Sequence, residues 1–411
     1  MLNSILNTFV VLLKMAFGFI LTKYVAINMG PTGVALFGQL QSLVSLFQNI
    51  PHGISNGVIS NTAAVKDDAT RPYWSWWFSS LQMCVIIYSL LLSSCFFYVE
   101  IAELIFKRSG FENYYLLLVL IYPLFHLYSL GNAMNTGLLK FKEYLTLNIT
   151  AMIAYIVIIL FYYYCYNEIN VFLAAILFIP FCGVVVFVFT SIPYINSIKI
   201  QKIVEVEQLK SLFKYFSATA LSVFLAPIVL MFIRNSLVDD FGLSAAGNWQ
   251  AMWRVSEIYT GVITLGLSAL VLPKFARADS YDKVIQVFKE VLYFAVPVLV
   301  FGAFIIYFGK EIWLPLLFSD EFHIPDEFFW FQLPGDILKT GCWLISYLIL
   351  SKRKLKLYAF LEVTFSLLFA LLAVVAIDLC GIIGVPAAFF INQLLCLIIL
   401  TWWFSFVFKN E

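Results

Sequence analysis

The sequence predicts an all-α polytopic membrane protein of about twelve transmembrane helices in two pseudo-symmetric six-helix lobes. Three observations predict this fold: the apolar composition, a series of span-length apolar segments, and a weak internal repeat. Of the 411 residues, 62% are hydrophobic and 12% are charged, whereas soluble globular domains are about 45–50% apolar and about 25% charged. A chain of this composition is expected to lie largely in a lipid bilayer.

The apolar segments have the length that a membrane-spanning helix requires, about 20 residues. The predicted spans are 5–28, 34–60, 74–98, 113–136, 145–166, 170–195, 211–237, 245–272, 285–308, 328–350, 357–378 and 382–408. The longest loops, 196–210 and 309–327, are too short to hold a separate catalytic domain.

Basic residues gather on one side of these spans. Of the 25 Lys and Arg residues, 17 lie in loops and span edges on the side of the N-terminus, and three (Lys107, Arg108 and Lys310) lie on the opposite side. Because Lys and Arg are enriched in cytoplasmic loops, we expect both termini to face the cytoplasm.

An internal repeat becomes visible when the chain is shifted against itself by 212 residues. NMGPTGVALFGQLQSL (28–43) then lies over DFGLSAAGNWQAMWRV (240–255), so that Gly30 matches Gly242. A duplication in one orientation predicts two lobes, 1–198 and 199–411, with a binding site in the cleft between them.

Several kinds of chemistry are excluded by the motifs that are missing. No GxxxxGK[ST] phosphate-binding loop occurs, so nucleotide hydrolysis is not expected. The seven cysteines form no CxxC pair and the three histidines are scattered, so we expect neither disulfides nor a metal site. We predict a transporter without a cofactor and without catalytic activity, because two repeated halves suit alternating access better than a channel filter or an enzyme.

Charged residues inside the spans point to the substrate. The predicted spans hold five basic and three acidic residues, which are Lys14, Lys23, Arg234, Arg254, Lys339, Glu257, Asp336 and Glu362. A charge at a helix centre costs at least about 2.5 kcal/mol on insertion scales, so such residues normally face a wet cavity or a partner. The positive surplus predicts an anionic substrate, attracted by Lys14, Lys23 and Arg234.

Each of these residues also has a structural interpretation. Lys23 and Arg234 lie near the expected outer membrane edge, where a long side chain can reach the interface. Arg254 and Glu257 are three residues apart, so they can neutralise each other on one helix face. Glu257 is also the most central acidic residue, and we expect it to carry a proton if an ion gradient drives transport.

The tenth predicted span contains Asp336 and Lys339, which can pair on one helix face. Pro334 and Gly335 precede them and weaken a helix, so this stretch is a candidate hinge and gate. On the eighth span, Trp249, Trp253 and Tyr259 are candidates for stacking on a sugar ring and Gln250 for binding it, although packing in the core is the alternative for each aromatic residue.

The most specific stretches of the sequence resemble a known family. KYVAINMGPTG (23–33), GNWQ (247–250) and WFQLPGDILKTG (330–341) are similar to segments of Wzx-type flippases, which serve O-antigen and enterobacterial common antigen units. The resemblance implies the MATE-like polysaccharide transporter superfamily, with two six-helix lobes in a V. It also implies translocation of undecaprenyl-pyrophosphate-linked oligosaccharide from the cytoplasmic to the periplasmic leaflet of the bacterial inner membrane.

The pattern of the family extends to a set of individual positions. They are Lys14, Lys23, Gly30, Pro31, Gly33, Asn56, Gly57, Arg234, Trp249, Gln250, Glu257, Tyr259, Gln332, Gly335, Asp336 and Lys339. At position 257 the resemblance implies Asp, and this chain has Glu. Arg254 departs from the pattern and is a candidate for specificity toward the repeat unit.

The resemblance also sets expectations about partners. Besides the lipid-linked oligosaccharide and membrane lipids, these are a polysaccharide polymerase and a chain-length regulator; we expect a monomer that binds no nucleic acid. The alternative function is a MATE-like exporter of small molecules or drugs, and it predicts an acid-rich cavity rather than a basic one.

Overall fold

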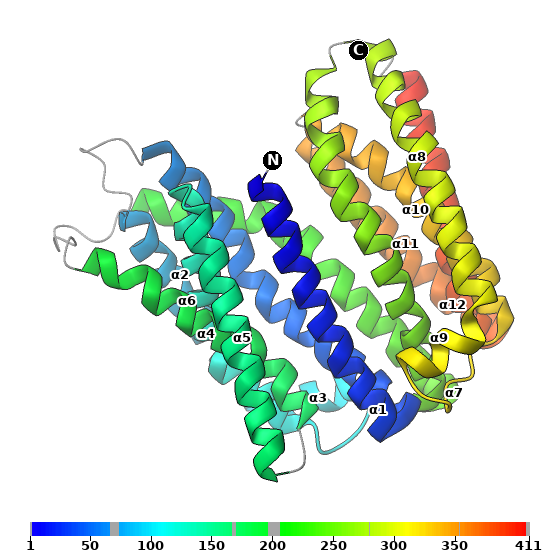
Figure 1. Cartoon of the computed structure of the whole chain (residues 1–411), viewed down its shortest axis with the longest axis horizontal. Helices are drawn as coiled ribbons and strands as arrows, with labels where there is room; N and C mark the ends of the chain where they lie inside the picture. The colour runs from blue at the N-terminus through cyan, green and yellow to red at the C-terminus, as the bar shows by residue number, and fades with distance from the viewer. Residues whose placement is uncertain are drawn as a thin grey trace. The chain divides into compact units, whose positions relative to one another are not determined.

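The computed structural model describes residues 2–65, 74–166, 170–195, 206–278, 280–352 and 354–407. These residues contain no β-strand and are helical apart from short turns, as Figure 1 shows. The α-helices are α1 (Leu2–Val65), α2 (Trp74–Ser94), α3 (Tyr98–Phe106), α4 (Glu112–Gly137), α5 (Phe141–Tyr166), α6 (Val171–Ile195), α7 (Val206–Arg277), α8 (Tyr281–Phe308), α9 (Lys310–Leu317), α10 (Asp326–Ser351), α11 (Leu355–Cys380) and α12 (Gly384–Trp402). Short turns of tighter or wider helix are η1 (Cys95–Phe97), η2 (Gly381–Ile383) and η3 (Trp403–Val407).

The predicted all-α fold is confirmed, because each of the twelve predicted spans corresponds to helix in the described residues. α1 and α7 each contain two of the spans. Six helical segments of the described chain are long and apolar enough to cross a membrane, and these are 74–106, 112–137, 141–166, 171–189, 281–308 and 355–406, the last holding both α11 and α12. The chain is therefore a multi-pass membrane protein.

Glycine interrupts the two longest helices at the positions that the repeat matches. Gly30 in α1 has φ 61° and ψ −159°, and Gly242 in α7 has φ 82° and ψ 172°. Residues with a Cβ rarely adopt such positive φ values. The same backbone conformation at both positions supports the duplication that the sequence predicts.

The chain divides into two compact units. Unit 1 contains residues 1–14 and 39–227, and unit 2 contains residues 15–38 and 228–411. Both α1 and α7 therefore contribute residues to each unit. The predicted lobe boundary between 198 and 199 lies outside the described residues and stays a prediction.

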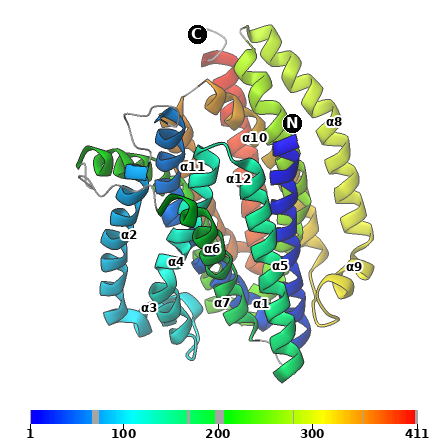
Figure 2. The same cartoon turned by 60° about the vertical axis from the view of Figure 1, so that its left-hand side comes forward.

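Unit 1 is built around α4, which packs on α2 and on α6. Figure 2 shows α4 beside α6. The start of α7 joins this unit through Gln208, whose side chain accepts a hydrogen bond from Ser79 at 2.9 Å and donates one to Ser75 at 3.0 Å. Leu212 on the next turn of α7 packs into a core cluster with Trp77 and Leu130. These contacts fix the first part of α7 against α2.

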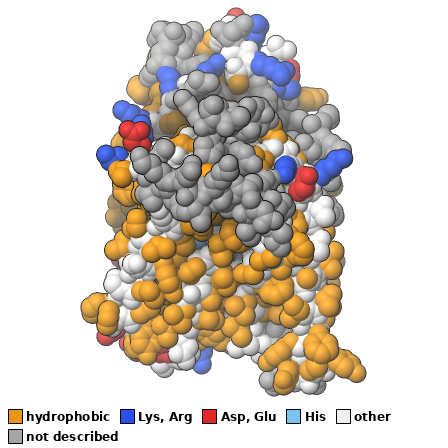
Figure 3. All heavy atoms as spheres, turned by 90° about the vertical axis from the view of Figure 1, so that its left-hand side faces the viewer, with side chains coloured by type: hydrophobic (Ala, Val, Ile, Leu, Met, Phe, Trp, Pro, Cys, Tyr) orange, Lys and Arg blue, Asp and Glu red, His pale blue; other side chains and the backbone are white. Residues whose placement is uncertain are grey.

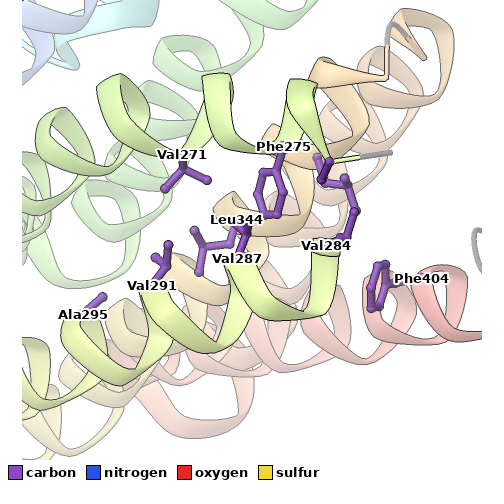
Figure 4. Packing of buried hydrophobic residues seen from close by; sticks show 10 residues of the cluster. Val271, Phe275, Val284, Val287, Val291, Ala295, Leu344 and Phe404 are labelled. Atoms are coloured by element: carbon purple, nitrogen blue, oxygen red, sulfur yellow. The ribbon is translucent and has the colours of Figure 1, made fainter. Parts of the chain in front are cut away.

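Unit 2 has an apolar core between α8 and the end of α7. Figure 4 shows Phe275 of α7 and Val287 and Val291 of α8 facing one another, with Leu344 of α10 beside them. Ser280 caps the N-terminus of α8, because its side chain accepts a hydrogen bond from the backbone N–H of Lys283 at 3.4 Å. A hydroxyl at this position satisfies a backbone donor that has no partner within the helix.

The outer surface is largely apolar. Figure 3 shows one face on which hydrophobic side chains cover a broad area, while most of the Lys, Arg, Asp and Glu side chains lie above it. Large hydrophobic residues are exposed on several helices, including Tyr164 on α5, Phe294 on α8 and Leu371 on α11. Such a surface is stable in contact with lipid chains rather than with water.

A close backbone contact in unit 2 predicts a strong steric effect at Gly247. A Cβ added there would lie 1.9 Å from the carbonyl oxygen of Pro31. Because the neighbour is backbone, it cannot rotate away, and Gly247→Ala should lower the free energy of unfolding by about 1–3 kcal/mol or more. Thermal unfolding of the purified protein in detergent would measure this.

Gly18→Ala is the matched control for this experiment. Gly18 also lies in a helix, and a Cβ added there meets nothing within 4 Å. We expect this variant to unfold at or above the wild-type temperature, because Ala is favoured over Gly in helices. Equal stability of the Gly247→Ala and Gly18→Ala variants would contradict the close packing of α1 on α7.

Candidate functional site

Lys14 lies in unit 1 at the start of a chain of hydrogen bonds between three helices. Its ammonium donates to the Tyr128 hydroxyl on α4 and lies 5.0 Å from the centre of that ring. The Tyr128 hydroxyl donates to Asn148 Oδ1 on α5 at 2.9 Å, and Asn148 Nδ2 donates to Asn132 Oδ1 at 2.7 Å. Each group in the chain therefore orients the next, and the chain holds the ammonium in place from α4 and α5.

Lys23 lies in unit 2 and has a different environment. Its ammonium donates to the carbonyl oxygens of Pro315 at 2.8 Å and Phe318 at 2.6 Å, at the C-terminal end of α9. A cation at this end of a helix is favoured by the helix dipole and by the carbonyl groups left without helical partners. Lys23 of α1 therefore holds the end of α9 against α1.

Arg234 on α7 is buried in unit 2. Only 1% of the residue is exposed. The alternative interpretation of the sequence, in which the guanidinium reaches the membrane surface, is therefore wrong for this structure. The guanidinium donates to Gln250 Oε1 from Nε at 3.1 Å and from Nη2 at 2.6 Å, and it lies 5.8 Å from the Trp249 ring. Gln250 packs directly against Gly38 of α1, where a Cβ would lie 2.7 Å from the amide carbon.

Trp253 connects most of the other candidate residues of unit 2. Its ring lies 5.6 Å from the Trp249 ring, and its indole nitrogen donates to Glu257 Oε1 at 3.1 Å. Arg254 binds the other oxygen of Glu257 at 2.6 Å, which confirms that these two residues pair. The Lys339 ammonium lies 5.7 Å from the Trp253 ring.

Asp336 on α10 has a partner on another helix. The carboxylate accepts a hydrogen bond from the Ser256 hydroxyl of α7 at 2.6 Å, and Asp336 is 1% exposed. No direct salt bridge joins Asp336 to Lys339 in the described chain, although the Lys339 ammonium is close enough to interact electrostatically with the carboxylate. Lys339 lies instead over three aromatic rings, Trp343 at 4.8 Å and Trp253 and Phe389 at 5.7 Å each.

α10 continues without interruption past the candidate hinge, with Pro334 inside the helix. A Cβ at Gly335 would lie 2.7 Å from the Phe389 ring of α12, so this glycine permits close packing of the two helices. The proposed hinge movement is not tested by this arrangement and stays a prediction.

The structure thus brings seven candidate residues into one connected cluster of unit 2. They are Arg234, Trp249, Gln250, Arg254, Glu257, Asp336 and Lys339. The Tyr259 hydroxyl donates to the Leu299 carbonyl of α8, its ring packs against Gly302, and it also lies within electrostatic range of Asp336. We call the connected set the α7–α10 cluster.

Several residues of these networks were not singled out from the sequence. They are Tyr128, Asn132, Asn148, Ser256, Trp343 and Phe389. Polar residues inside a span were the available signal for Asn132 and Asn148, since an amide in the bilayer normally has a hydrogen-bond partner. Nothing in the sequence distinguishes Phe389 from the 41 other phenylalanines.

The lysines of the spans meet neutral groups in the described part of the chain. Lys14 contacts a phenol, Lys23 contacts backbone carbonyls, and Lys339 contacts aromatic rings. Lys339 also lies within electrostatic range of the Asp336 and Glu362 carboxylates. Lys14 and Lys23 form no ion pair among the described residues, so an anion would complete the balance at these two lysines. Within the same residues, no group of three or more His, Cys, Asp or Glu residues is placed to hold a metal ion.

Comparison with solved structures gives the class of fold. An inward-facing multidrug resistance MATE family transporter of the MOP superfamily superposes with a TM-score of 0.77 at 15% identity, covering 94% of this chain and 93% of that one. The lipid II flippase MurJ, in an inward closed conformation, superposes with a TM-score of 0.71 at 19% identity, covering 98% of this chain and 87% of that one. The chain therefore has the fold of the MATE transporters, as the resemblance implied.

Curated proteins give more particular relatives, although no family model matches the chain. The proteins named Lipid III flippase from Escherichia coli (strain K12) and from Shigella flexneri are both 22% identical over 408 residues, covering 95% of this chain and 96% of each relative. The likeness to flippases of lipid-linked polysaccharide units that the sequence suggested is confirmed by these relatives.

Proposed function

We propose that the protein is a flippase that moves an undecaprenyl-pyrophosphate-linked oligosaccharide from the cytoplasmic to the periplasmic leaflet. The oligosaccharide would be a repeat unit of enterobacterial common antigen or O-antigen. The molecule is moved without covalent change, so we propose no catalytic activity. The full-length similarity to proteins named Lipid III flippase supports this class of substrate.

The observation that carries the proposal is that Lys14 of unit 1 and Lys23 of unit 2 donate their hydrogen bonds to neutral groups in the described residues. A pyrophosphate supplies the negative charge that these sites lack. In the α7–α10 cluster, Arg234 and Lys339 each lie beside tryptophan rings. Aromatic faces and amides are the groups that commonly bind sugars, but Trp249 and Gln250 are buried in this structure. A glycan would reach the partly exposed members of the cluster, Arg254, Glu257 and Lys339, and would reach Trp249 and Gln250 only in a conformation that opens the cluster.

Transport of small molecules or drugs is a second candidate, because the multidrug transporter superposes with a TM-score of 0.77. An exporter of cations would need acidic residues exposed to its substrate. In the α7–α10 cluster, Asp336 is buried and bound to Ser256. Glu257 is partly exposed, but its carboxylate is already paired with Arg254. This arrangement favours an anionic substrate.

Mass spectrometry of lipids that co-purify with the protein separates the two candidates. We expect a polyprenyl-pyrophosphate glycan, whose sugars would identify the pathway. Reconstitution in proteoliposomes with the same lipid would then measure movement between leaflets. Purification without such a lipid, combined with gradient-driven export of organic cations, would support the exporter instead.

Glu257 gives a prediction about energy coupling. We propose that an ion gradient drives transport and that Glu257 carries the proton, since 38% of its side chain is exposed and it is bound to Arg254 and Trp253. Glu257→Gln should leave lipid binding within about twofold of the wild type but remove the dependence of transport on a proton gradient, because an amide cannot be charged by losing a proton. Transport in vesicles with and without an imposed gradient measures this.

The control is Glu290→Gln, which removes an acidic residue that pairs with Lys274 at an exposed site of unit 2. Gradient dependence should be unchanged in this variant. If Glu257→Gln also keeps the full gradient dependence, Glu257 is not the proton carrier.

The cellular setting follows from the proposed substrate. We propose the bacterial inner membrane, with both termini in the cytoplasm as the basic residues predict. A polysaccharide polymerase and a chain-length regulator are proposed partners, since they would use the flipped unit on the periplasmic side. Labelling of cysteines introduced near either terminus, in intact and in permeabilised cells, would test the orientation.

A further inference from the structure

An apolar cavity of about 500 Å³ lies in unit 1 between three helices. It is lined by Leu124 of α4, by four residues of α5, by seven residues of α6 and by Asn170, which precedes α6. The residues of α5 are Tyr155, Ile158, Ile159 and Tyr162, and those of α6 are Leu173, Ala174, Leu177, Pro180, Phe181, Val184 and Val185. Ile158 and Tyr162 are themselves partly exposed on the lipid-facing surface. The cavity is thus accessible from the bilayer rather than enclosed in the core.

The chemistry of the lining excludes water as the occupant. A buried water needs two to four polar partners, whereas this lining is almost wholly apolar and aromatic. The Tyr155 hydroxyl, which is one of its few polar groups, already donates to the Ala174 carbonyl. In a membrane the cavity is therefore filled by hydrocarbon, which gains dispersion contacts with the lining.

The position of the cavity, next to the hydrogen-bond chain of Lys14, indicates which hydrocarbon occupies it. Tyr128, which binds Lys14, lies one turn after Leu124 on α4. Asn148, which continues the same chain of hydrogen bonds, lies seven residues before Tyr155 on α5, about 10 Å along the helix. Residues seven apart lie near one face of a helix, so the cationic network and the cavity occupy successive levels of the same two helices.

We propose that this cavity binds a segment of the polyprenyl chain of the substrate while the Lys14 network attracts its pyrophosphate. The inference rests on the proposed function and adds a site for the lipid part of the substrate. The anionic head and the isoprenoid chain then contact one unit at adjacent levels, so the chain contributes to recognition and is not merely dissolved in the bilayer.

The test compares ligands of different chain length on the full protein in nanodiscs of phosphatidylethanolamine and phosphatidylglycerol. The probes are undecaprenyl pyrophosphate, farnesyl pyrophosphate and inorganic pyrophosphate. We expect the wild type to bind the undecaprenyl probe most tightly. Val184→Trp fills the cavity from α6 and should weaken binding of that probe about tenfold, through lost dispersion contacts, while binding of inorganic pyrophosphate stays unchanged.

The matched control is Val157→Trp, which places the same side chain at an exposed position of α5 outside the cavity lining. It should bind all three probes as the wild type does. Lys14→Gln should weaken binding of every probe, because it removes the charge rather than the chain site. Leu177→Phe is a milder filling variant in case Val184→Trp unfolds.

A photo-crosslinking amino acid at Ile158 in the otherwise unchanged chain provides an independent measurement. We expect it to capture the undecaprenyl probe in preference to bilayer phospholipid. Capture of phospholipid alone, or unchanged undecaprenyl affinity in folded Val184→Trp and Leu177→Phe variants, would overturn the chain site and leave the flippase proposal standing. If the wild type binds none of the pyrophosphate probes, both proposals are wrong.

Discussion

Replacing Lys14 by Gln is expected to lower transport of the lipid-linked oligosaccharide at least tenfold, with protein levels unchanged. The reason is that a hydrogen bond to a charged group contributes about 1.5–3 kcal/mol, which corresponds to roughly ten- to a hundredfold in affinity. Gln is similar in length and still able to hydrogen bond, so it removes the charge and little else. Surface polysaccharide in a strain that lacks the chromosomal protein is the measurement.

Two further variants separate the charge of Lys14 from its position. Tyr128→Phe keeps the charge but removes the hydroxyl that accepts from Lys14 and donates to Asn148. We expect a smaller loss, which appears as weaker binding of the pyrophosphate rather than slower movement of bound substrate. Lys14→Arg should restore part of the activity, because the positive charge is kept.

Lys142→Gln is the control for loss of a positive charge, since Lys142 lies exposed near the start of α5. It should complement the strain fully. If Lys14→Gln also complements fully at matched expression, Lys14 does not bind the substrate, and its contact with Tyr128 is structural only.

The fold could be predicted from the sequence because the bilayer restricts the choices. Apolar segments of spanning length must be helical, since backbone groups in lipid need partners within the segment. The repeat aligned Gly30 with Gly242, and the structure shows that both glycines interrupt a long helix. The short helices α3 and α9 were not predicted, because eight or nine residues beside a span give too little periodicity to distinguish a helix from a loop.

The candidate site was predictable only where both partners lie on one helix. Arg254 and Glu257 pair as their spacing of three residues suggests. The partner of Lys23, in contrast, is the end of α9 nearly three hundred residues later, and Ser256 and Asp336 are on different helices. Such contacts depend on how the helices pack against one another, and the spacing of residues along the chain carries no information about this packing.

Asp336 and Lys339 show what this difference means for function. Their spacing suggested a pair that satisfies itself on α10, yet each residue contacts another helix. Asp336 accepts from Ser256 of α7, and Lys339 lies over Trp253 of α7 and Phe389 of α12. The two charges therefore connect α10 to two neighbouring helices and do not form an independent unit.

Exchanging the two residues, as Asp336→Lys with Lys339→Asp, is expected to abolish transport. A static pair would tolerate the exchange, because the attraction between opposite charges is unchanged. In this structure the ammonium introduced at position 336 would be buried beside Ser256, and the carboxylate introduced at position 339 would face the negative faces of three aromatic rings, which favour cations. Surface polysaccharide in the two single variants and the double variant, at matched expression, makes the comparison.

Asp336→Asn provides the test that does not depend on a disruptive change. Asn keeps the shape of Asp336 and can still accept a hydrogen bond from Ser256, so the protein should fold with nearly wild-type stability. We expect transport to fall at least tenfold if the charge at 336 takes part in gating, since a neutral hydrogen bond is worth only about half of a charge-assisted one. Full activity in the exchanged double variant would show that Asp336 and Lys339 act as a simple ion pair and take no part in gating.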